Sequence, residues 1–330
     1  MSEPKVVKTA CLFCPLACGI DVYVKDNRPV KVESMKESVV GPLCIKAEVI
    51  PEWYETELKS RLVHPLQKVN NNWREITWDQ ALDTIAEELT KIKQKYGPES
   101  LGLFMGQVET FYDYYYLARR FALAYGTPSY YSGSCYCYFT KVVAGILTYG
   151  AYAPPTLITT KCIIVWAGNP TGSVPFAADN MLVAKTRGTV KLIVIDPRRT
   201  LLAKAADIHL QLRPGTDGAL ALAFINVIIS EGLYDKEFVE KYTLGFDKLV
   251  EHVKAYSPEK VEEITWVPAD KIREAARIYA TTKPATIFQG NCLDNVDTGF
   301  QACRAIDSLV SITGNLDAKG GSTLMPSLYL

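Results

Sequence analysis

The stretch Lys191-Leu-Ile-Val-Ile-Asp196 places four consecutive apolar residues before an aspartate, and a helical pattern follows it. A continuous apolar run of this length predicts a strand that is buried on both faces, as in a parallel sheet covered by helices. We expect strands at 162–167, 189–195, 208–212 and 285–289, and helices near 139–147, 175–187, 218–231, 236–242, 269–280 and 299–313. Strands that alternate with helices in this way predict a doubly wound, mostly parallel α/β fold.

The ends of three expected strands carry residues that suit a nucleotide. In doubly wound sheets, ligands bind at the carboxyl ends of the strands. Glycines there let backbone N–H groups approach a phosphate, an aspartate accepts from ribose or guanine donors, and arginines clamp phosphate. The candidate residues are Gly168, Asn169, Pro170, Asp196, Arg198, Arg199, Arg213, Gly215 and Asp217. Ordinary turns with solvated side chains are the alternative, and the dinucleotide motif G-x-G-x-x-G is absent, so NAD is not the obvious ligand.

A cysteine motif lies near the start of the chain. Cys11-Leu-Phe-Cys14-Pro-Leu-Ala-Cys18 has C-x2-C-x3-C spacing, and Cys44 follows a hairpin expected over residues 20–32. Four thiolates suit a [4Fe–4S] cluster, because each iron needs one soft sulfur ligand. Zinc also binds four thiolates, but zinc ribbons usually supply two C-x2-C pairs. Disulfides are the third possibility, and no secretory signal supports them. We therefore expect a small cluster domain over residues 1–62.

Cys137 belongs to a second candidate site. It stands in Tyr131-Ser-Gly-Ser-Cys-Tyr-Cys-Tyr138, directly before the helix expected at 139–147. A thiol at a helix N-terminus has a lowered pKa, which suits a nucleophile or a metal ligand. A buried, inert cysteine is the alternative at this position.

The composition limits the class of protein. The 330 residues contain 36 Lys and Arg and 36 Asp and Glu, so the balanced charge does not indicate a nucleic-acid or anionic-membrane partner. The most apolar segment, 218–229, is interrupted by Asn226 and is too short to span a bilayer. The N-terminus has no apolar leader and no twin arginine. We expect a cytoplasmic protein whose nine cysteines act as metal ligands and buried apolar residues.

These motifs, in this order, resemble the molybdenum/tungsten bis-pterin enzyme family of the dimethyl sulfoxide reductase type. The resemblance covers essentially the whole chain and matches the N-terminal portion of a catalytic subunit. The remaining matching phrases are Trp73-Arg-Glu-Ile-Thr-Trp-Asp-Gln-Ala81, Gly168-Asn-Pro170, Asp196-Pro-Arg-Arg-Thr200, Arg213-Pro-Gly-Thr-Asp217 and Thr313-Gly-Asn-Leu-Asp-Ala-Lys-Gly-Gly321.

The resemblance implies cofactors and residue roles. It implies a [4Fe–4S] cluster on Cys11, Cys14, Cys18 and Cys44, and Mo or W held by two molybdopterin guanine dinucleotides. Lys46 matches a lysine placed between cluster and pterin, and Cys137 matches the position that ligates the metal. The three strand-end loops match those that hold the dinucleotides. The implied domains are 63–135, the first part of an interrupted α/β domain, and 136–330, a Rossmann-like pterin-dinucleotide domain.

The resemblance also implies a reaction class and partners. Family members perform two-electron oxidation or reduction of a small substrate, and the cluster relays electrons to an iron–sulfur subunit. Catalytic subunits of the family usually continue for several hundred residues and end in a C-terminal barrel, which is absent here. We therefore expect a missing C-terminal half or a second polypeptide, or else a non-catalytic electron-transfer subunit or fragment.

The sequence does not single out one reaction type within this family. Formate dehydrogenases usually have histidine after the metal-ligating residue, whereas this chain has Tyr138. The chain also resembles acetylene hydratase, a non-redox tungsten enzyme, which uses an aspartate where this chain has Pro15. Because proline cannot activate or orient water, hydration ranks second. Sulfur-compound reductases, which often use a cysteine ligand, remain open.

Overall fold

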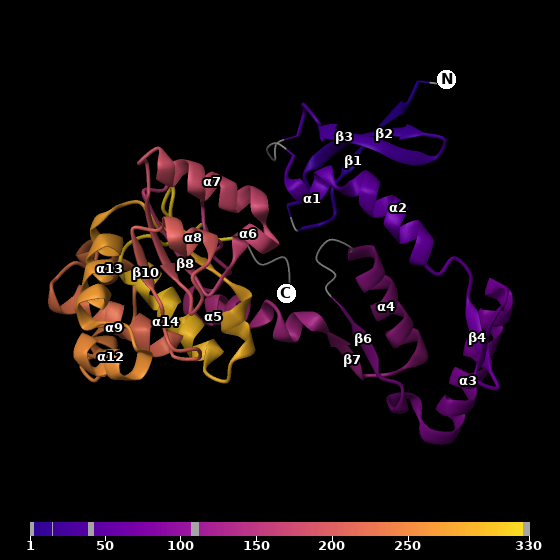
Figure 1. Cartoon of the computed structure of the whole chain (residues 1–330). Coiled ribbons are helices and arrows are strands. Elements are labelled where there is room, and N and C mark those ends of the chain that lie inside the picture. The colour runs from indigo at the N-terminus through magenta and orange to yellow at the C-terminus, as the bar shows by residue number, and fades with distance from the viewer. Residues whose placement is uncertain (1–2, 15, 39–42, 107–111, 326–330) are drawn as a thin grey trace. The chain divides into compact units, whose positions relative to one another are not determined.

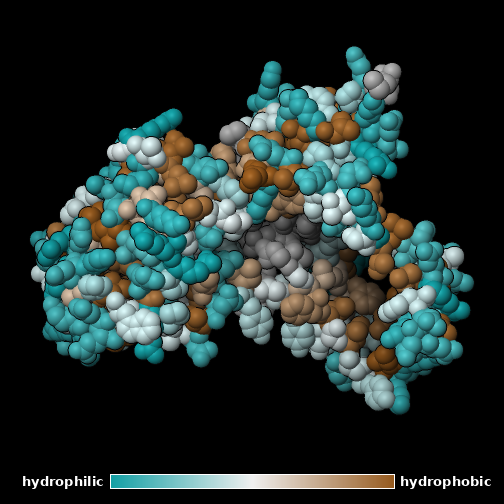
Figure 2. Space-filling model, viewed as in Figure 1, coloured by the Kyte–Doolittle hydropathy of each residue, from teal (hydrophilic) through white to brown (hydrophobic). Residues whose placement is uncertain are grey.

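A computed structural model describes residues 3–14, 16–38, 43–106 and 112–325. The chain forms two compact units, Met1–Ser134 and Cys135–Leu330, which are described separately (Figure 1). No helix among the described residues is both long enough and apolar enough to cross a membrane. Figure 2 shows apolar side chains reaching the surface of both units among hydrophilic ones.

The N-terminal unit begins with a small antiparallel sheet. Its strands are β1 (Lys5–Ala10), β2 (Gly19–Lys25) and β3 (Arg28–Ser34), in the order β1-β2-β3. The two residues between β2 and β3 both have positive φ, as a tight hairpin turn requires. The structure thus contains the hairpin expected over residues 20–32, and it adds β1, which the sequence analysis did not predict. Two short helices follow, α1 (Ile45–Glu48) and α2 (Ile50–Ser60).

The rest of this unit is built from short strands and two longer helices. They are β4 (Leu66–Val69), β5 (Asn72–Glu75), α3 (Trp78–Tyr96), η1 (Pro98–Ser100), β6 (Leu103–Met105), α4 (Tyr112–Tyr125) and β7 (Tyr130–Ser132). Thr77 begins α3 with a capping box, because its hydroxyl accepts from the Gln80 amide while the Gln80 side chain accepts from the Thr77 amide. Helix α3 buries none of its residues. The exposed side of α3 includes Trp78 and Leu82.

The C-terminal unit is organised around a four-stranded parallel sheet. The strands are β8 (Cys162–Trp166), β9 (Lys191–Ile195), β10 (Ile208–Leu210) and β11 (Ala285–Gln289). Their order is β10-β9-β8-β11. Strands β9 and β10 therefore lie on one side of β8, and β11, which comes later in the chain, lies on the other side. This reversal places the topological switch point at the carboxyl ends of β8 and β11. The doubly wound, parallel arrangement is the one predicted from the sequence.

Helices cover both faces of this sheet (Figure 1). On one face, α7 (Pro175–Thr186) and α8 (Leu201–Ala205) pack on residues such as Val194. On the other face, α9 (Asp217–Ser230), α13 (Ala269–Thr281) and α14 (Gly299–Ile312) form the larger core. The remaining elements are η2 (Gly133–Tyr136), α5 (Phe139–Tyr149), α6 (Pro170–Ser173), α10 (Lys236–Tyr242), α11 (Phe246–Val253), α12 (Pro258–Thr265) and η3 (Asn291–Asn295).

Candidate functional site

The N-terminal cysteines lie on two neighbouring backbone segments. Cys11, Cys14 and Cys18 lie between β1 and β2, and the Cys11 amide donates to the Cys18 carbonyl at 2.8 Å, which closes the loop. Cys44 stands at the N-cap of α1, and its carbonyl accepts from the amides of Ala47 and Glu48. The helix therefore fixes the direction in which the fourth thiol leaves the backbone.

The four thiols lie close enough together to affect one another electrostatically. Burial raises the pKa of Cys11, and the neighbouring thiols of Cys14 and Cys44 raise it further, while Lys46 lowers it. Burial also raises the pKa of Cys18, with further contributions from Cys14, Cys11 and Cys44. Mutually repelling thiolates in a partly buried loop are the donor set that a cationic iron–sulfur core neutralises. The Lys46 ammonium lies close enough to act on this group.

The described residues hold no group of three or more His, Cys, Asp or Glu side chains arranged around a single metal ion. A [4Fe–4S] cluster presents four separate irons, so its four thiolates need not point at one position. Thiols that lie close enough to shift one another's pKa thus fit the cluster expected from the sequence.

At the switch point of the C-terminal sheet, two strand-end loops make close backbone contact. The Gly290 amide donates to the Trp166 carbonyl at 2.8 Å. A Cβ added to Gly168 would lie 3.1 Å from the Gly290 Cα atom. Gly290, which the sequence analysis did not single out, is therefore as important to this edge as Gly168. Its position directly after a strand expected from the sequence could have identified Gly290 as a residue of this edge.

Asn169 and Pro170 shape the loop that follows β8. The backbone carbonyl of Asn169 accepts from the amides of Gly172 and Ser173. The side-chain Oδ1 atom of Asn169 accepts from the Thr171 hydroxyl at 2.7 Å. Pro170 is buried at the first position of α6. The Asn169 side chain thus holds its own loop in shape.

The loop after β9 combines a buried carboxylate with exposed cations. Asp196 is buried, and its Oδ1 atom accepts from the Arg198 amide at 2.7 Å. Arg198 and Arg199 are exposed. Arg199 lines a cavity of about 680 Å³ together with Lys204, His209, Trp266 and Lys271. Three long cationic side chains around one hollow at a strand end would attract a phosphate group.

The loop after β10 is tied to the end of α12 and to β8. The Arg213 guanidinium lies over the Trp266 ring at 5.6 Å, and Gly215 adopts a φ of +83°. Asp217 is buried at the start of α9, where its Oδ1 atom accepts from the Trp166 indole nitrogen at 2.8 Å. Burial raises the Asp217 pKa despite this hydrogen bond, and Asp196 adds to the rise. The structure thus gives the Asp217 carboxylate a partner within the protein.

Cys137 lies at the same edge of the sheet. It precedes α5, and its Sγ atom accepts a hydrogen bond from the Asn291 Nδ2 atom at 3.4 Å. Asn291 opens η3, two residues after the end of β11. The switch point therefore brings together the thiol, the close glycine pair and the predicted loop after β8, and the predicted loops after β9 and β10 follow along the same carboxyl edge of the sheet. A soft thiolate beside phosphate-compatible loops is a donor set that fits a metal carried by a dinucleotide cofactor.

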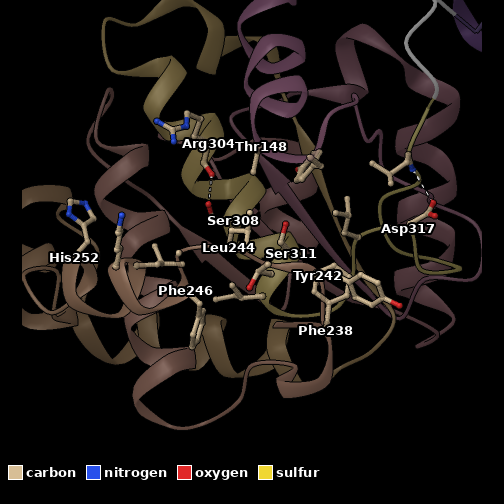
Figure 3. A pocket seen from close by; sticks show the side chains of 18 residues that line it. Thr148, Phe238, Tyr242, Leu244, Phe246, His252, Arg304, Ser308, Ser311 and Asp317 are labelled. Carbon is tan, nitrogen blue, oxygen red and sulfur yellow. Dashed lines mark hydrogen bonds between the residues drawn. The ribbon is translucent and has the colours of Figure 1, made fainter. Parts of the chain in front are cut away.

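A larger cavity of about 1160 Å³ lies elsewhere in this unit (Figure 3). It is lined by the end of α5, the segment between α10 and α11, and α14. The hydroxyls of Thr148, Ser308 and Ser311 point along their own helices and donate to helix carbonyls. Thr148 lies at the C-terminal end of α5, whereas Cys137 lies before its N-terminal end. This cavity is therefore separate from the candidate site.

Comparison with known families decides the class of protein. Residues 61–325 match the family described as molybdopterin oxidoreductase, and residues 4–53 match the molybdopterin oxidoreductase Fe4S4 domain. The chain belongs to the molybdopterin oxidoreductase family. Members of this family carry a [4Fe–4S] cluster and molybdopterin with Mo or W, so both predicted cofactors and the predicted fold are confirmed.

Individual relatives of this family member include enzymes with different names and reactions. Acetylene hydratase of Syntrophotalea acetylenica is 38% identical over 92% of the chain, and the match covers 43% of that protein. F420-dependent formate dehydrogenase subunit alpha of Methanocaldococcus jannaschii is 35% identical over 96% of the chain and 47% of its own length. The chain thus spans less than half the length of these two relatives.

A solved structure supports the fold of this family member. Acetylene hydratase from Pelobacter acetylenicus matches with a TM-score of 0.83 and 35% sequence identity. The match covers 96% of the chain and 44% of the solved chain. The predicted α/β fold with an N-terminal cluster domain is therefore confirmed.

Proposed function

We propose that the protein is part of a molybdopterin-dependent oxidoreductase that carries out a two-electron oxidation or reduction of a small substrate. The observation that carries this proposal is the position of Cys137 at the switch point of the sheet, hydrogen-bonded to Asn291 beside the strand-end loops. A soft thiolate at this edge suits a Mo or W centre, and it does not by itself separate redox chemistry from hydration.

Separate residues would hold the two cofactors. Cys11, Cys14, Cys18 and Cys44 would ligate the cluster, and the Lys46 ammonium, which acts on Cys11, would lie beside it. When bound, molybdopterin with its metal supplies the two-electron chemistry that side chains cannot supply.

At the sheet edge, Cys137 would ligate the metal. Gly168, Asn169 and Pro170 would admit a phosphate to the first loop, and Arg198, Arg199 and Arg213 would neutralise charge on two guanine dinucleotides. The buried Asp196 carboxylate would accept from a guanine or ribose donor. Gly215, with its positive φ, and Asp217, at the N-terminus of α9, would shape the third loop.

Partners and compartment follow from this chemistry. A one-electron cluster needs an acceptor, so we propose an iron–sulfur subunit as the partner. The alpha-subunit name of a relative supports a multi-subunit enzyme. The remainder of the pterin site would come from further residues of the same protein or from a second polypeptide. A reducing cytoplasm would keep the four cluster thiols free of disulfides.

The test is to measure Fe, Mo and W together in protein purified without oxygen. About four irons and one Mo or W per chain are expected. Replacing Cys137 by Ala should abolish substrate-dependent reduction of an electron acceptor and leave the cluster signal intact, whereas Cys292→Ser, an exposed cysteine, should change neither. Iron without Mo or W would reject the catalytic proposal and favour an electron-transfer module.

Hydration is a second candidate, because acetylene hydratase is among the relatives. A hydratase would turn over with no electron acceptor present, whereas the oxidoreductase would not. Pro15, which cannot orient water, argues against this candidate. Turnover that is independent of any acceptor would reverse the ranking.

A further inference from the structure

A buried ion pair lies next to the candidate metal ligand. The Lys141 Nζ atom is 3.0 Å from the Asp294 Oδ2 atom, and the two side chains are 2% and 0% exposed. Removing two charges from water is costly, and replacing such a pair by apolar residues is often neutral or stabilising. The pair therefore calls for a role other than stability.

Asp294 binds the backbone as well as the side chain of Lys141. Its Oδ1 atom accepts from the Lys141 amide at 3.0 Å. Lys141 is the third residue of α5, whose N-cap residue, Tyr138, provides no side-chain cap. Asp294 thus caps α5 from a segment 153 residues later in the chain. A carboxylate at this end is also favoured by the helix dipole. The cap fixes η3 against the start of α5, where Cys137 lies.

The ion pair continues into a hydrogen-bond chain that ends at sulfur. The Lys141 Nζ atom donates to the Asn291 Oδ1 atom at 2.6 Å, and the Asn291 Nδ2 atom donates to the Cys137 Sγ atom at 3.4 Å. An ammonium group has only donors, so only the oxygen end of the amide can face it. Lys141 therefore decides which end of Asn291 faces the thiol, and that end is the donor.

We propose that Asn291, oriented by the Lys141–Asp294 pair, is a positioning residue for the metal-ligating thiolate of Cys137. This inference rests on the proposed function. A hydrogen bond to a ligating sulfur fixes its direction and withdraws charge from it, as second-layer partners do at other metal sites. Because Asp294 balances the charge of Lys141, the thiolate gains a donor without a net cation beside it.

The direct test uses Asn291→Asp, which keeps the size and an oxygen toward Lys141 but replaces the donor with a carboxylate oxygen. In metal-free protein, we would measure alkylation of Cys137 by iodoacetamide at pH 7, resolved by peptide mass spectrometry. Loss of a hydrogen bond to a charged group predicts a rate about tenfold lower. Asn180→Asp on α7, also exposed, makes the same chemical change away from the site and should leave the rate unchanged.

The role of the ion pair is tested by the double variant Lys141→Met with Asp294→Asn, which removes both charges together. Asn291 would then lose its fixed orientation, so the alkylation rate should fall below wild type but less than in Asn291→Asp. If this variant does not fold, Lys141→Arg keeps a donor for Asn291 and should retain the wild-type rate. Equal rates in Asn291→Asp and Asn180→Asp would overturn the proposal.

A second readout separates this inference from the proposed function. In the metal-loaded protein, the Mo(V) or W(V) electron paramagnetic resonance signal should change in both Cys137→Ala and Asn291→Asp. A signal unchanged in Cys137→Ala would show that Cys137 is not a ligand, and the proposed function would fail. A signal changed by Cys137→Ala but not by Asn291→Asp would overturn only the positioning role.

Discussion

Gly290 and Gly168 lie so close together that a Cβ added to Gly290 would stand 2.4 Å from the Gly168 Cα atom and 2.0 Å from the Ala167 carbonyl oxygen. No real side chain tolerates such distances to backbone atoms. The contact joins the ends of β8 and β11, the two strands that flank the switch point. The shape of the candidate site therefore depends on glycine at a position outside the predicted set.

Gly290→Ala should lower the free energy of unfolding by about 2–3 kcal/mol, because the backbone of two loops must move apart. Urea unfolding followed by circular dichroism measures this loss. Gly218→Ala is the matched control, since its Cβ would meet Ala302 at an ordinary 3.6 Å. A control that destabilises as much as Gly290→Ala would contradict the explanation.

Cys44→Ser should prevent assembly of a complete cluster, because serine removes one of four soft ligands. We expect the iron content of anaerobically reconstituted protein to fall well below four per chain and the broad visible absorbance to be lost. Cys292→Ser, an exposed cysteine of the other unit, should retain the wild-type iron content. Full iron content in Cys44→Ser would remove Cys44 from the ligand set.

Trp166→Phe should destabilise the C-terminal unit by about 1–2 kcal/mol at neutral pH, since the buried Asp217 carboxylate loses its indole donor. Burial already raises the pKa of Asp217, and loss of this hydrogen bond should raise that pKa further. The destabilisation should therefore shrink as the pH falls and Asp217 takes up a proton. Urea unfolding at two pH values measures the difference, and a loss that is independent of pH would argue that only ring packing matters.

Asp307→Asn should stabilise the protein at neutral pH. Asp307 is buried in α14, where burial raises its pKa to about 6 from 3.8, and Gln289 donates to its Oδ1 atom. Between these values the folded state holds a proton that the unfolded state releases, so stability falls as the pH rises through this range. Asn keeps the acceptor for Gln289 without a charge.

The expected gain for Asp307→Asn is roughly 2–3 kcal/mol at pH 7.5 and close to zero at pH 4. Thermal or urea unfolding of both proteins across this range measures it. A gain of equal size at both ends of the range would show that the carboxyl does not titrate as the structure indicates.

The sequence predicts the central sheet because its strands are continuous apolar runs. Strand β11 and helix α10 coincide with the expected ranges 285–289 and 236–242. The apolar run at 101–105 also predicts a buried strand, but β6 covers only Leu103–Met105 and its Phe104 is exposed. The sequence also predicts a helix over roughly 110–125, which corresponds to α4 (Tyr112–Tyr125), while residues 110 and 111 lie outside the described part of the chain.

The roles of individual side chains were harder to predict. Asn291 and Asp294 lie 154 and 153 residues from the groups that they contact, so no local pattern reveals them. Asp217 sits where the sequence predicts it, but its partner, Trp166, comes from another strand. Periodicity reports which side of an element is apolar, whereas these contacts depend on how distant elements meet.

The strand order has a consequence for how the protein is made. Cys137 leaves the ribosome long before Asn291, and β11 is the last strand to join the sheet. Contacts of such sequence separation form late, because the intervening chain must first be ordered. The thiol therefore remains without its amide donor, and α5 without its distant cap, until most of the C-terminal unit has been synthesised. A metal-ligand site that includes this hydrogen bond is therefore complete only after the chain has been synthesised through Asn291.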